Sequence, residues 1–336
     1  MRTYNIPIFV PHKGCPFDCV FCNQRRITGA VEDVTADTVT KTIDMYLETI
    51  GGRENSKIEA AFFGGSFTGI PIEEQTILLS AAYDYVKAGR IDGIRLSTRP
   101  DYIDTDILDN LKSYGVTTIE LGVQSMDDDV LLKSGRGHTA EDVRRAVRLI
   151  KEYGFTSGLQ MMTGLPGDSD EKAIYTANEI IKLKPEIVRI YPTLTIRDTR
   201  LEKMYNSGEY IPQTIDDAAQ LCKTLLLMFE ANNIKVIRLG LQSTDEICEN
   251  GAVVAGPVHS AFGEIVENAV YYDLITDAIG ECADCTVTVA VNDREVSKAV
   301  GNRRRNIIKI KKERNIDLKI AGDKNINIRE VRRVCC

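Results

Sequence analysis

This sequence of 336 residues lacks two kinds of apolar segment, and each absence excludes a class of protein. It has no run of about 18 apolar residues, so we expect no membrane-spanning helix and no membrane partner. The first ten residues lack the long apolar core of a signal peptide, so we expect a cytoplasmic protein. The nine cysteines are an odd number, which fits a reducing compartment better than a framework of disulfides.

Three cysteines lie close together near the start of the chain, at Cys15, Cys19 and Cys22. Clustered thiolates in an intracellular chain bind metal more often than they form disulfides. A closed zinc site needs four ligands, and His12 is the nearest candidate for the fourth. An iron–sulfur cluster also usually takes four cysteines, so three leave one iron open to a small molecule. Three thiols buried for packing are the alternative, which a loop rich in proline and aspartate disfavours.

The overall composition is that of a globular protein, with 43% hydrophobic and 27% charged residues, and the length allows a large and a small domain. The net charge of −7 is unevenly spread. Residues 294–336 hold 14 Lys and Arg against 5 Asp and Glu, so this end carries +9 and the rest −16. A basic end on an acidic body predicts an anionic partner for that end. An ordinary solvated helix face is the alternative.

Strand-like and helix-like runs alternate through most of the chain. This alternation predicts a parallel α/β sheet with helices outside, and six units rather than eight fit an open, partial (β/α)6 barrel. Each expected strand ends in a polar or glycine-rich stretch, which is where such barrels gather their chemistry. We expect strands at 6–10, 58–63, 93–96, 117–123, 156–162 and 187–191, and helices at 34–50, 72–87, 139–153 and 171–183, with Thr35 and Asp104 as N-caps.

The remaining third changes character, and we expect a domain at 1–252 followed by a small α+β domain at 253–336. A strand and loop are expected at 237–243, a linker of small residues at 251–256, and a helix at 261–277. A β–α–loop–α–β order over 286–320 resembles the core of a KH domain, whose Gly-led loop clamps nucleic-acid backbone. Arg304 stands where the second glycine of that loop belongs. A small cap that packs on the barrel is the alternative.

The C-x3-C-x2-C spacing, with Phe21 before the last cysteine, resembles the signature of the radical S-adenosylmethionine (SAM) superfamily. The resemblance implies a [4Fe–4S] cluster on Cys15, Cys19 and Cys22, whose open iron chelates SAM. Reductive cleavage then yields methionine and a 5′-deoxyadenosyl radical, with an electron donor such as a flavodoxin or ferredoxin. The likeness covers residues 5–232 and is closest to the Elongator catalytic subunit, a tRNA-modifying enzyme, and to oxygen-independent coproporphyrinogen oxidase. STRPD at 97–101, ELGVQS at 120–125, RGHT at 136–139 and YPTLTIRDT at 191–199 carry the Elongator likeness.

The same resemblance implies the residues that would hold SAM. The glycine-rich SAM loop would be Gly64, Gly65 and Ser66, where glycine lets the backbone approach the methionine amine. Ribose and carboxylate contacts would come from Gln124, Arg136 and Gln160, since an arginine fork suits a carboxylate. The remaining cofactor contacts would be Phe21, Leu165 beside adenine, and Ser97, which replaces a glutamate of the relatives. Ordinary strand-end polar residues are the alternative for the two glutamines and Arg136.

Candidates for substrate contact follow the sixth strand and begin the next helix. Tyr191 and Arg197 could face substrate or simply pack and pair locally. His259 is a catalytic candidate, although a lone histidine is more often a structural hydrogen-bonding residue. A second metal site at Cys282, Cys285, Cys335 and Cys336 is a further possibility.

We therefore expect a radical SAM enzyme that modifies RNA, with tRNA as the leading substrate, through its basic C-terminal domain. The sequence leaves no room for the acetyltransferase domain of the Elongator subunit, so acetyl transfer as in that enzyme is not expected. One alternative is radical chemistry on a small molecule such as a porphyrin, which Phe9 disfavours because coproporphyrinogen oxidase has an aromatic hydroxyl there. The other alternative is a non-catalytic iron–sulfur protein that binds RNA.

Overall fold

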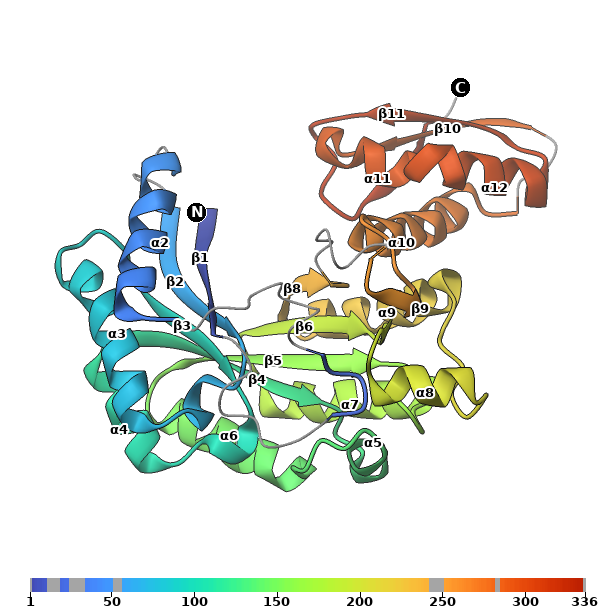
Figure 1. Cartoon of the computed structure of the whole chain (residues 1–336). Coiled ribbons are helices and arrows are strands. Elements are labelled where there is room, and N and C mark those ends of the chain that lie inside the picture. The colour runs from blue at the N-terminus through green and yellow to red at the C-terminus, as the bar shows by residue number, and fades with distance from the viewer. Residues whose placement is uncertain are drawn as a thin grey trace. The chain divides into compact units, whose positions relative to one another are not determined.

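The computed structural model describes residues 2–10, 19–23, 34–50, 56–241, 251–281 and 285–334 (Figure 1). The chain divides into two compact units. The barrel unit comprises Met1–Gln213 and Met228–Val258, and the C-terminal unit comprises Thr214–Leu227 and His259–Cys336. Helix α9 (Ile215–Ala231) gives its first part to the C-terminal unit and its last part to the barrel unit.

The barrel unit is built on a seven-stranded sheet in which all neighbouring strands are parallel. The strands lie side by side in chain order, as successive β–α units joined by crossovers require. The α/β partial barrel expected from the sequence is thus confirmed, and a seventh strand extends it. The strands are β1 (Arg2–Val10), β2 (Ser56–Gly64), β3 (Gly93–Thr98), β4 (Val116–Gln124), β5 (Thr156–Thr163), β6 (Ile187–Pro192) and β8 (Lys235–Leu239).

Helices pack on the outside of the curved sheet, and several begin at side-chain caps (Figure 1). Thr35 and Asp104 cap their helices as expected, each accepting a backbone N–H three residues on. Thr139 and Asp142 form a reciprocal capping box. The helices are α2 (Ala36–Thr49), α3 (Ile72–Lys87), α4 (Thr105–Ser113), α5 (Asp128–Lys133), α6 (Ala140–Glu152), α7 (Asp170–Leu183) and α8 (Arg200–Asn206), with 3-10 turns at Phe67–Gly69 and Pro100–Tyr102.

The segment expected as a linker of small residues differs from that expectation. It contains strand β9 (Val253–Ala255), which pairs antiparallel with β7 (Thr195–Ile196). Gly256 has φ +112°, and a Cβ there would lie 2.9 Å from the carbonyl oxygen of Thr193. Glycine at this position therefore serves a close backbone approach, and not the flexibility that its composition suggested.

The C-terminal unit packs helices on a three-stranded sheet of order β11–β10–β12. The expected β–α–loop–α–β order is present, while the last strand was not expected. Apolar side chains of the central strand and of the long first helix form its core, Tyr271 and Val289 among them. The elements are α10 (Phe262–Ile279), β10 (Thr286–Val291), α11 (Val296–Val300), α12 (Arg305–Arg314), β11 (Asp317–Gly322) and β12 (Val331–Val334), with 3-10 turns at Asp293–Glu295 and Asn302–Arg304.

The turn after β5 is held by two polar side chains. Asp168 Oδ2 accepts the N–H of Gly164 at 2.9 Å, and the hydroxyl of Tyr210 donates to the carbonyl oxygen of Gly164 at 2.7 Å. Burial raises the pKa of Asp168 to about 6. The turn places Leu165, which is buried, in an apolar cluster with Val130 and Met162.

Replacing Asp168 by asparagine is expected to remove a pH-dependent loss of stability. The folded protein keeps the Asp168 proton up to about pH 6, whereas the unfolded chain releases it near 3.8, so stability falls as the pH rises between these values. The loss is on the order of 2–3 kcal/mol. Urea denaturation from pH 4.5 to 8 should show that the free energy of unfolding of Asp168→Asn increases relative to that of the wild type as the pH rises. Asparagine can still accept the Gly164 N–H, so the turn itself should be kept. A stability difference that is the same at every pH would contradict this assignment.

Candidate active site

The cysteine segment is described from Cys19 to Asn23, and Cys15 lies outside the described residues. The N–H of Cys22 donates to the carbonyl oxygen of Cys19 at 2.9 Å, which closes a tight turn between the two. Cys19 is buried and Cys22 is partly exposed. Two soft ligands are therefore held close together on one turn.

Three hydrogen bonds fix this segment to the polar loops that follow the strands. The N–H of Val20 donates to the carbonyl of Ser134 at 3.0 Å, and the carbonyl of Val20 accepts the N–H of Leu201 at 2.7 Å. The side-chain amide of Asn23 donates to the carbonyl of Arg197 at 3.2 Å. The thiols are thus tied to both the α5–α6 loop and the start of α8.

The guanidinium of Arg136 lies directly against one of the thiols. Its Nη1 is 3.4 Å from Cys19 Sγ, and its Nη2 donates to the carbonyl of Gly122 at 2.6 Å. Arg99 Nη2 in turn donates to the Arg136 carbonyl at 2.6 Å. One guanidinium thus contacts both a predicted cluster ligand and the end of β4. Arg136 Nε is buried and has no hydrogen-bond partner among the described residues.

The two predicted glutamines meet at the ends of neighbouring strands. Gln160 Nε2 lies 3.4 Å from Gln124 Oε1. Gln124 has φ +65° at a break in the β4–β5 register, an arrangement that re-aims a strand-end side chain. A Cβ on Gly122 would lie 3.2 Å from both Gln124 and Arg136, so glycine there lets the two side chains converge.

The predicted glycine-rich loop follows β2 in a fixed conformation. Gly64 has φ +103°, which glycine adopts without strain, and the N–H of Gly65 donates to the Val10 carbonyl at 2.9 Å. The hydroxyl of Ser66 is buried and shares a 2.9 Å hydrogen bond with Thr98. The loop is therefore anchored between β1 and β3.

An apolar cluster brings together three predicted residues from distant parts of the chain. Val130, Met162 and Leu165 are buried, and Phe21 and Tyr191 pack against them. The aromatic residue between the two described cysteines thus shares one cluster with the residue predicted to flank adenine and with a predicted substrate residue.

His138 is a buried residue of this region that the sequence did not single out. Its Nε2 lies 3.2 Å from the Val123 carbonyl. Burial, with the guanidinium groups of Arg136 and Arg99, lowers the pKa of His138 to about 3, so the ring is neutral at physiological pH. Its place two residues after Arg136 was the available signal, and its contacts indicate that it positions the loop.

Three other predicted contact residues have fewer described interactions with the residues around Cys19 and Arg136. Ser97 pairs in register with Glu120 across β3 and β4 and is partly exposed. Arg197 is exposed, and its carbonyl oxygen accepts the hydrogen bond from Asn23 of the cysteine segment. His259 belongs to the C-terminal unit, where its Nδ1 accepts the N–H of Ala261 at 3.0 Å. The roles of these three residues stay predictions.

The residues present fit an iron–sulfur cluster and SAM. Thiolates suit iron, and the orphaned Nε–H of Arg136 beside Cys19 suits a carboxylate oxygen. Within the described part of the chain no three His, Cys, Asp or Glu side chains gather as a metal site, the third predicted ligand, Cys15, being outside it. Of the four cysteines considered for a second metal, the structure describes Cys285, which packs against the C-terminal core.

No helix in the described ranges is both long and apolar enough to cross a membrane.

Two family models match this chain, and curated proteins resemble part of it. Residues 9–180 match the radical SAM superfamily model, and residues 185–272 match the radical SAM C-terminal domain. A tRNA uridine(34) acetyltransferase of Methanocaldococcus jannaschii is 28% identical over 255 residues, 64% of this chain and 47% of that protein. Human Elongator complex protein 3 is 29% identical over 254 residues, 67% of this chain and 46% of that protein. The chain thus spans about half the length of these relatives.

Solved structures agree on the fold. Elp3 of Methanocaldococcus infernus superposes with a TM-score of 0.66 at 24% identity, covering 81% of this chain and 64% of that one. The Escherichia coli coproporphyrinogen III oxidase HemN gives a TM-score of 0.50 at 16% identity, covering 69% and 53%. With a family model that matches half of its residues and a fold that agrees, this chain belongs to the radical SAM superfamily, a superfamily of enzymes.

Proposed function

We propose that this enzyme cleaves SAM reductively at a [4Fe–4S] cluster and uses the radical to modify RNA, with tRNA as the substrate class. The family and the tRNA-acting names of the relatives support this proposal. The observation that carries it is the guanidinium of Arg136, which touches Cys19 Sγ and keeps Nε–H free for a carboxylate. A cluster thiolate and a SAM carboxylate are the two groups that must lie close together in such a site.

The roles of the other residues follow from their positions. Cys15, Cys19 and Cys22 would hold the cluster, and Gln124 and Gln160 would bind the ribose hydroxyls with their paired amides. When bound, the cluster and SAM supply a 5′-deoxyadenosyl radical.

The glycine loop and the apolar cluster would hold the rest of SAM. The carbonyls near Gly64 and Gly65 would accept hydrogen bonds from the methionine amine, since the positive φ of Gly64 turns the backbone there. Leu165 and Phe21, which share one cluster, would pack against the adenine and the sulfonium side. We assign Ser66 to positioning of this loop through Thr98.

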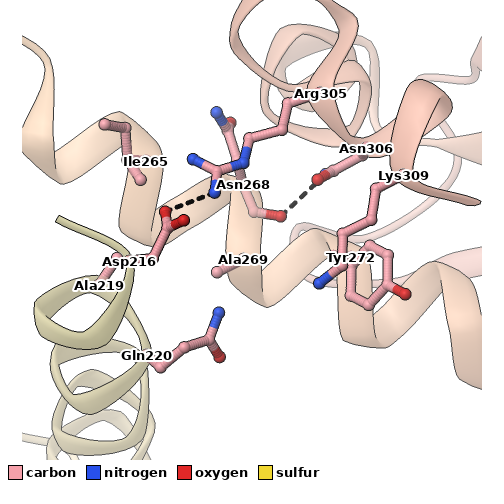
Figure 2. Close-up of a pocket in the computed structure, with 10 residues that line it drawn as sticks. All are labelled: Asp216, Ala219, Gln220, Ile265, Asn268, Ala269, Tyr272, Arg305, Asn306 and Lys309. Carbon is pink, nitrogen blue, oxygen red and sulfur yellow. Dashed lines mark hydrogen bonds and ion pairs between the residues drawn. The ribbon is translucent and has the colours of Figure 1, made fainter. Parts of the chain in front are cut away.

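The C-terminal unit offers a loop suited to phosphates. Arg303 and Arg304 are exposed, have φ +51° and +63°, and precede α12, a helix without a side-chain N-cap. Neither arginine has an ion-pair partner among the described residues, whereas Arg305 pairs with Asp216 of α9 (Figure 2). Unpaired arginines at a helix N-terminus suit the backbone of RNA.

A pocket beside this loop adds groups that can contact a nucleotide. It lies between α9, α10 and α12 and is lined by Asp216, Gln220, Tyr272 and Lys309 among others (Figure 2). Lys309 Nζ sits 3.9 Å from the centroid of the Tyr272 ring. The mixture of donors, acceptors and an aromatic face supports RNA rather than a simple anion as the ligand.

We place this activity in the cytoplasm, with a flavodoxin or ferredoxin as electron donor. Both assignments rest on the radical chemistry and on the tRNA-acting relatives.

The first prediction concerns the cluster. Protein reconstituted anaerobically with iron and sulfide, then given dithionite and SAM, should form 5′-deoxyadenosine, and bulk tRNA should raise the yield. Cys19→Ala should lose iron and product, whereas Cys222→Ala, which removes a fully buried thiol in the C-terminal unit, should keep both. A well-loaded wild-type cluster that forms no product would refute the proposal.

The second prediction separates the two roles of Arg136. Arg136→Lys keeps the positive charge near Cys19 but loses the Nε–H, so SAM affinity should fall about tenfold, or about 1.4 kcal/mol, with iron content retained. Calorimetric titration of the reconstituted protein with SAM measures this. Arg145→Lys, on the exposed face of α6, is the matched control. An unchanged SAM affinity in Arg136→Lys would show that the Nε–H of Arg136 does not bind SAM.

The third prediction concerns the basic loop. Arg303→Ala with Arg304→Ala should weaken tRNA binding about tenfold and lower the slope of log K against log salt by about 1.5, as expected for two lost phosphate contacts. Lys311→Ala with Lys312→Ala removes the same charge from the other end of α12 and should have a smaller effect. Equal effects of the two pairs would indicate a diffuse charge effect and no loop site.

A further inference from the structure

The pocket of the C-terminal unit is lined along one face of its longest helix, α10 (Figure 2). All of its lining residues belong to this unit. On α10 they are Ile265, Asn268, Ala269 and Tyr272. Their spacing of i, i+3, i+4 and i+7 puts them on the same side of the helix. The side chain of Asn268 is therefore on the face of α10 that lines the pocket.

The carboxamide of Asn268 is buried without a hydrogen-bond partner. The residue is 2% exposed, and neither its Oδ1 nor its Nδ2 has a partner among the described residues. Its backbone carbonyl, in contrast, accepts a hydrogen bond from the side-chain amide of Asn306 at 2.8 Å. An unpaired buried amide costs free energy. A ligand that supplies both a donor and an acceptor would remove that cost.

An ion pair spans the pocket from α9 to α12. Arg305 Nη2 donates to Asp216 Oδ1, and both residues line the pocket (Figure 2). The two side chains are 47% and 68% exposed, so solvent screens the pair and it contributes little stability. A phosphate can therefore compete with Asp216 for Arg305. Because Arg305 directly follows the two arginines of the basic loop, all three can reach phosphates of the same RNA strand.

The groups of the pocket restrict the chemistry of the ligand. A carboxamide presents one donor and one acceptor side by side, and each nucleobase has an edge with the complementary pair. A simple anion offers acceptors alone and would leave Oδ1 of Asn268 unpaired. The ring of Tyr272 adds an aromatic wall, with Lys309 Nζ 3.9 Å from its centroid. Aromatic walls of this kind flank unstacked bases in proteins that bind single-stranded RNA.

We propose that this pocket binds one unstacked nucleobase of an RNA, that the amide of Asn268 hydrogen-bonds the edge of the base, and that the basic loop and Arg305 hold the neighbouring phosphates. The inference rests on the proposed RNA function and adds a base contact to its phosphate contacts. Asp216 is the competing anion that keeps Arg305 paired until RNA binds. The ligand class is single-stranded RNA and not one particular base, because each base has an edge that fits a carboxamide.

The test compares two fluorescein-labelled probes of equal length, an oligouridine and an abasic oligonucleotide that keeps only sugars and phosphates. Anisotropy titrations with the full chain measure both dissociation constants. The wild type should bind the oligouridine at least about tenfold more tightly. Asn268→Leu should lose most of this preference, while its affinity for the abasic probe stays within about twofold. Asn232→Leu, at an exposed asparagine of the barrel unit, is the control and should match the wild type.

Thermal unfolding distinguishes an amide that binds a ligand from one that supports the fold. Leucine is close to asparagine in size and removes the unpaired polar group, so the Tm of Asn268→Leu should stay the same or rise. A lower Tm, together with equal losses for both probes, would show that the amide supports the fold and would overturn the inference. Ala269→Leu fills the pocket from the same face of α10 and leaves Asn268 intact, so it should lose the same preference for oligouridine.

A second pair of variants tests the competition for Arg305. Asp216→Asn removes the competing charge and should raise the affinity for both probes about threefold. Asp217→Asn removes the same charge from the next residue, whose carboxylate accepts from the Thr214 hydroxyl at 2.6 Å, and should give a smaller gain. Equal gains would show a diffuse charge effect and overturn the role of the ion pair.

The outcomes separate this inference from the proposed function. A wild type that binds neither the probes nor tRNA refutes the RNA function and the inference with it. Equal wild-type affinities for the oligouridine and the abasic probe, or a preference that Asn268→Leu keeps, overturn the base site and leave the proposed phosphate contacts standing.

Discussion

The placement of one guanidinium group determines the geometry of the candidate active site. Arg136 joins the end of β4, through the Gly122 carbonyl, to Cys19 Sγ, and its own carbonyl is held by Arg99. The Nε–H of the same guanidinium is buried and has no hydrogen-bond partner within the described residues, which suits a carboxylate oxygen. The turn that carries the cysteines and the barrel that carries the glutamines are therefore connected through the same side chain.

The interior of the barrel unit follows from a second electrostatic constraint, which is that buried charges must be paired. Glu59 and Glu120 are almost fully buried, and each is bound by two cations. Removing one partner from such a group leaves an uncompensated charge, at a cost on the order of 3–5 kcal/mol. A closed barrel fills its interior with layers of apolar side chains, but an open one can keep a polar path across its strands. Here that path ends at Tyr191, beside the cysteine segment.

The sequence could predict what depends on local pattern. The strands, the caps at Thr35 and Asp104, and the polar strand ends all follow from periodicity and short-range hydrogen bonding, and the structure confirms them. Contacts between distant residues were not predictable in the same way. Arg136 and Cys19 are 117 positions apart, and no pattern shows that their side chains touch.

The roles of two kinds of residue could not be predicted correctly from the sequence, for physical reasons. Small residues at 251–256 suggested a linker, although part of this segment pairs with β7 as a strand and Gly256 lies against the carbonyl oxygen of Thr193. Charged residues on strands, such as Glu120 and Arg189, show no sign in the sequence of whether they face solvent or one another. Their ion pair depends on the space beside Gly158, which becomes apparent only when the strands are placed side by side in the sheet.

The loop before α12 shows how backbone strain can point to function without any bound ligand. Two consecutive arginines with positive φ cost on the order of 1–3 kcal/mol each, and their exposed side chains gain no packing in return. Buried contacts next to the two arginines fix this backbone conformation. Gly301 packs against Asn306, and the side-chain amide of Asn306 donates to the carbonyls of Asn268 and Ala299. A fold that holds two arginines strained, exposed and without ion-pair partners within the described residues presents their charges outward. This arrangement supports the RNA contact proposed for this loop.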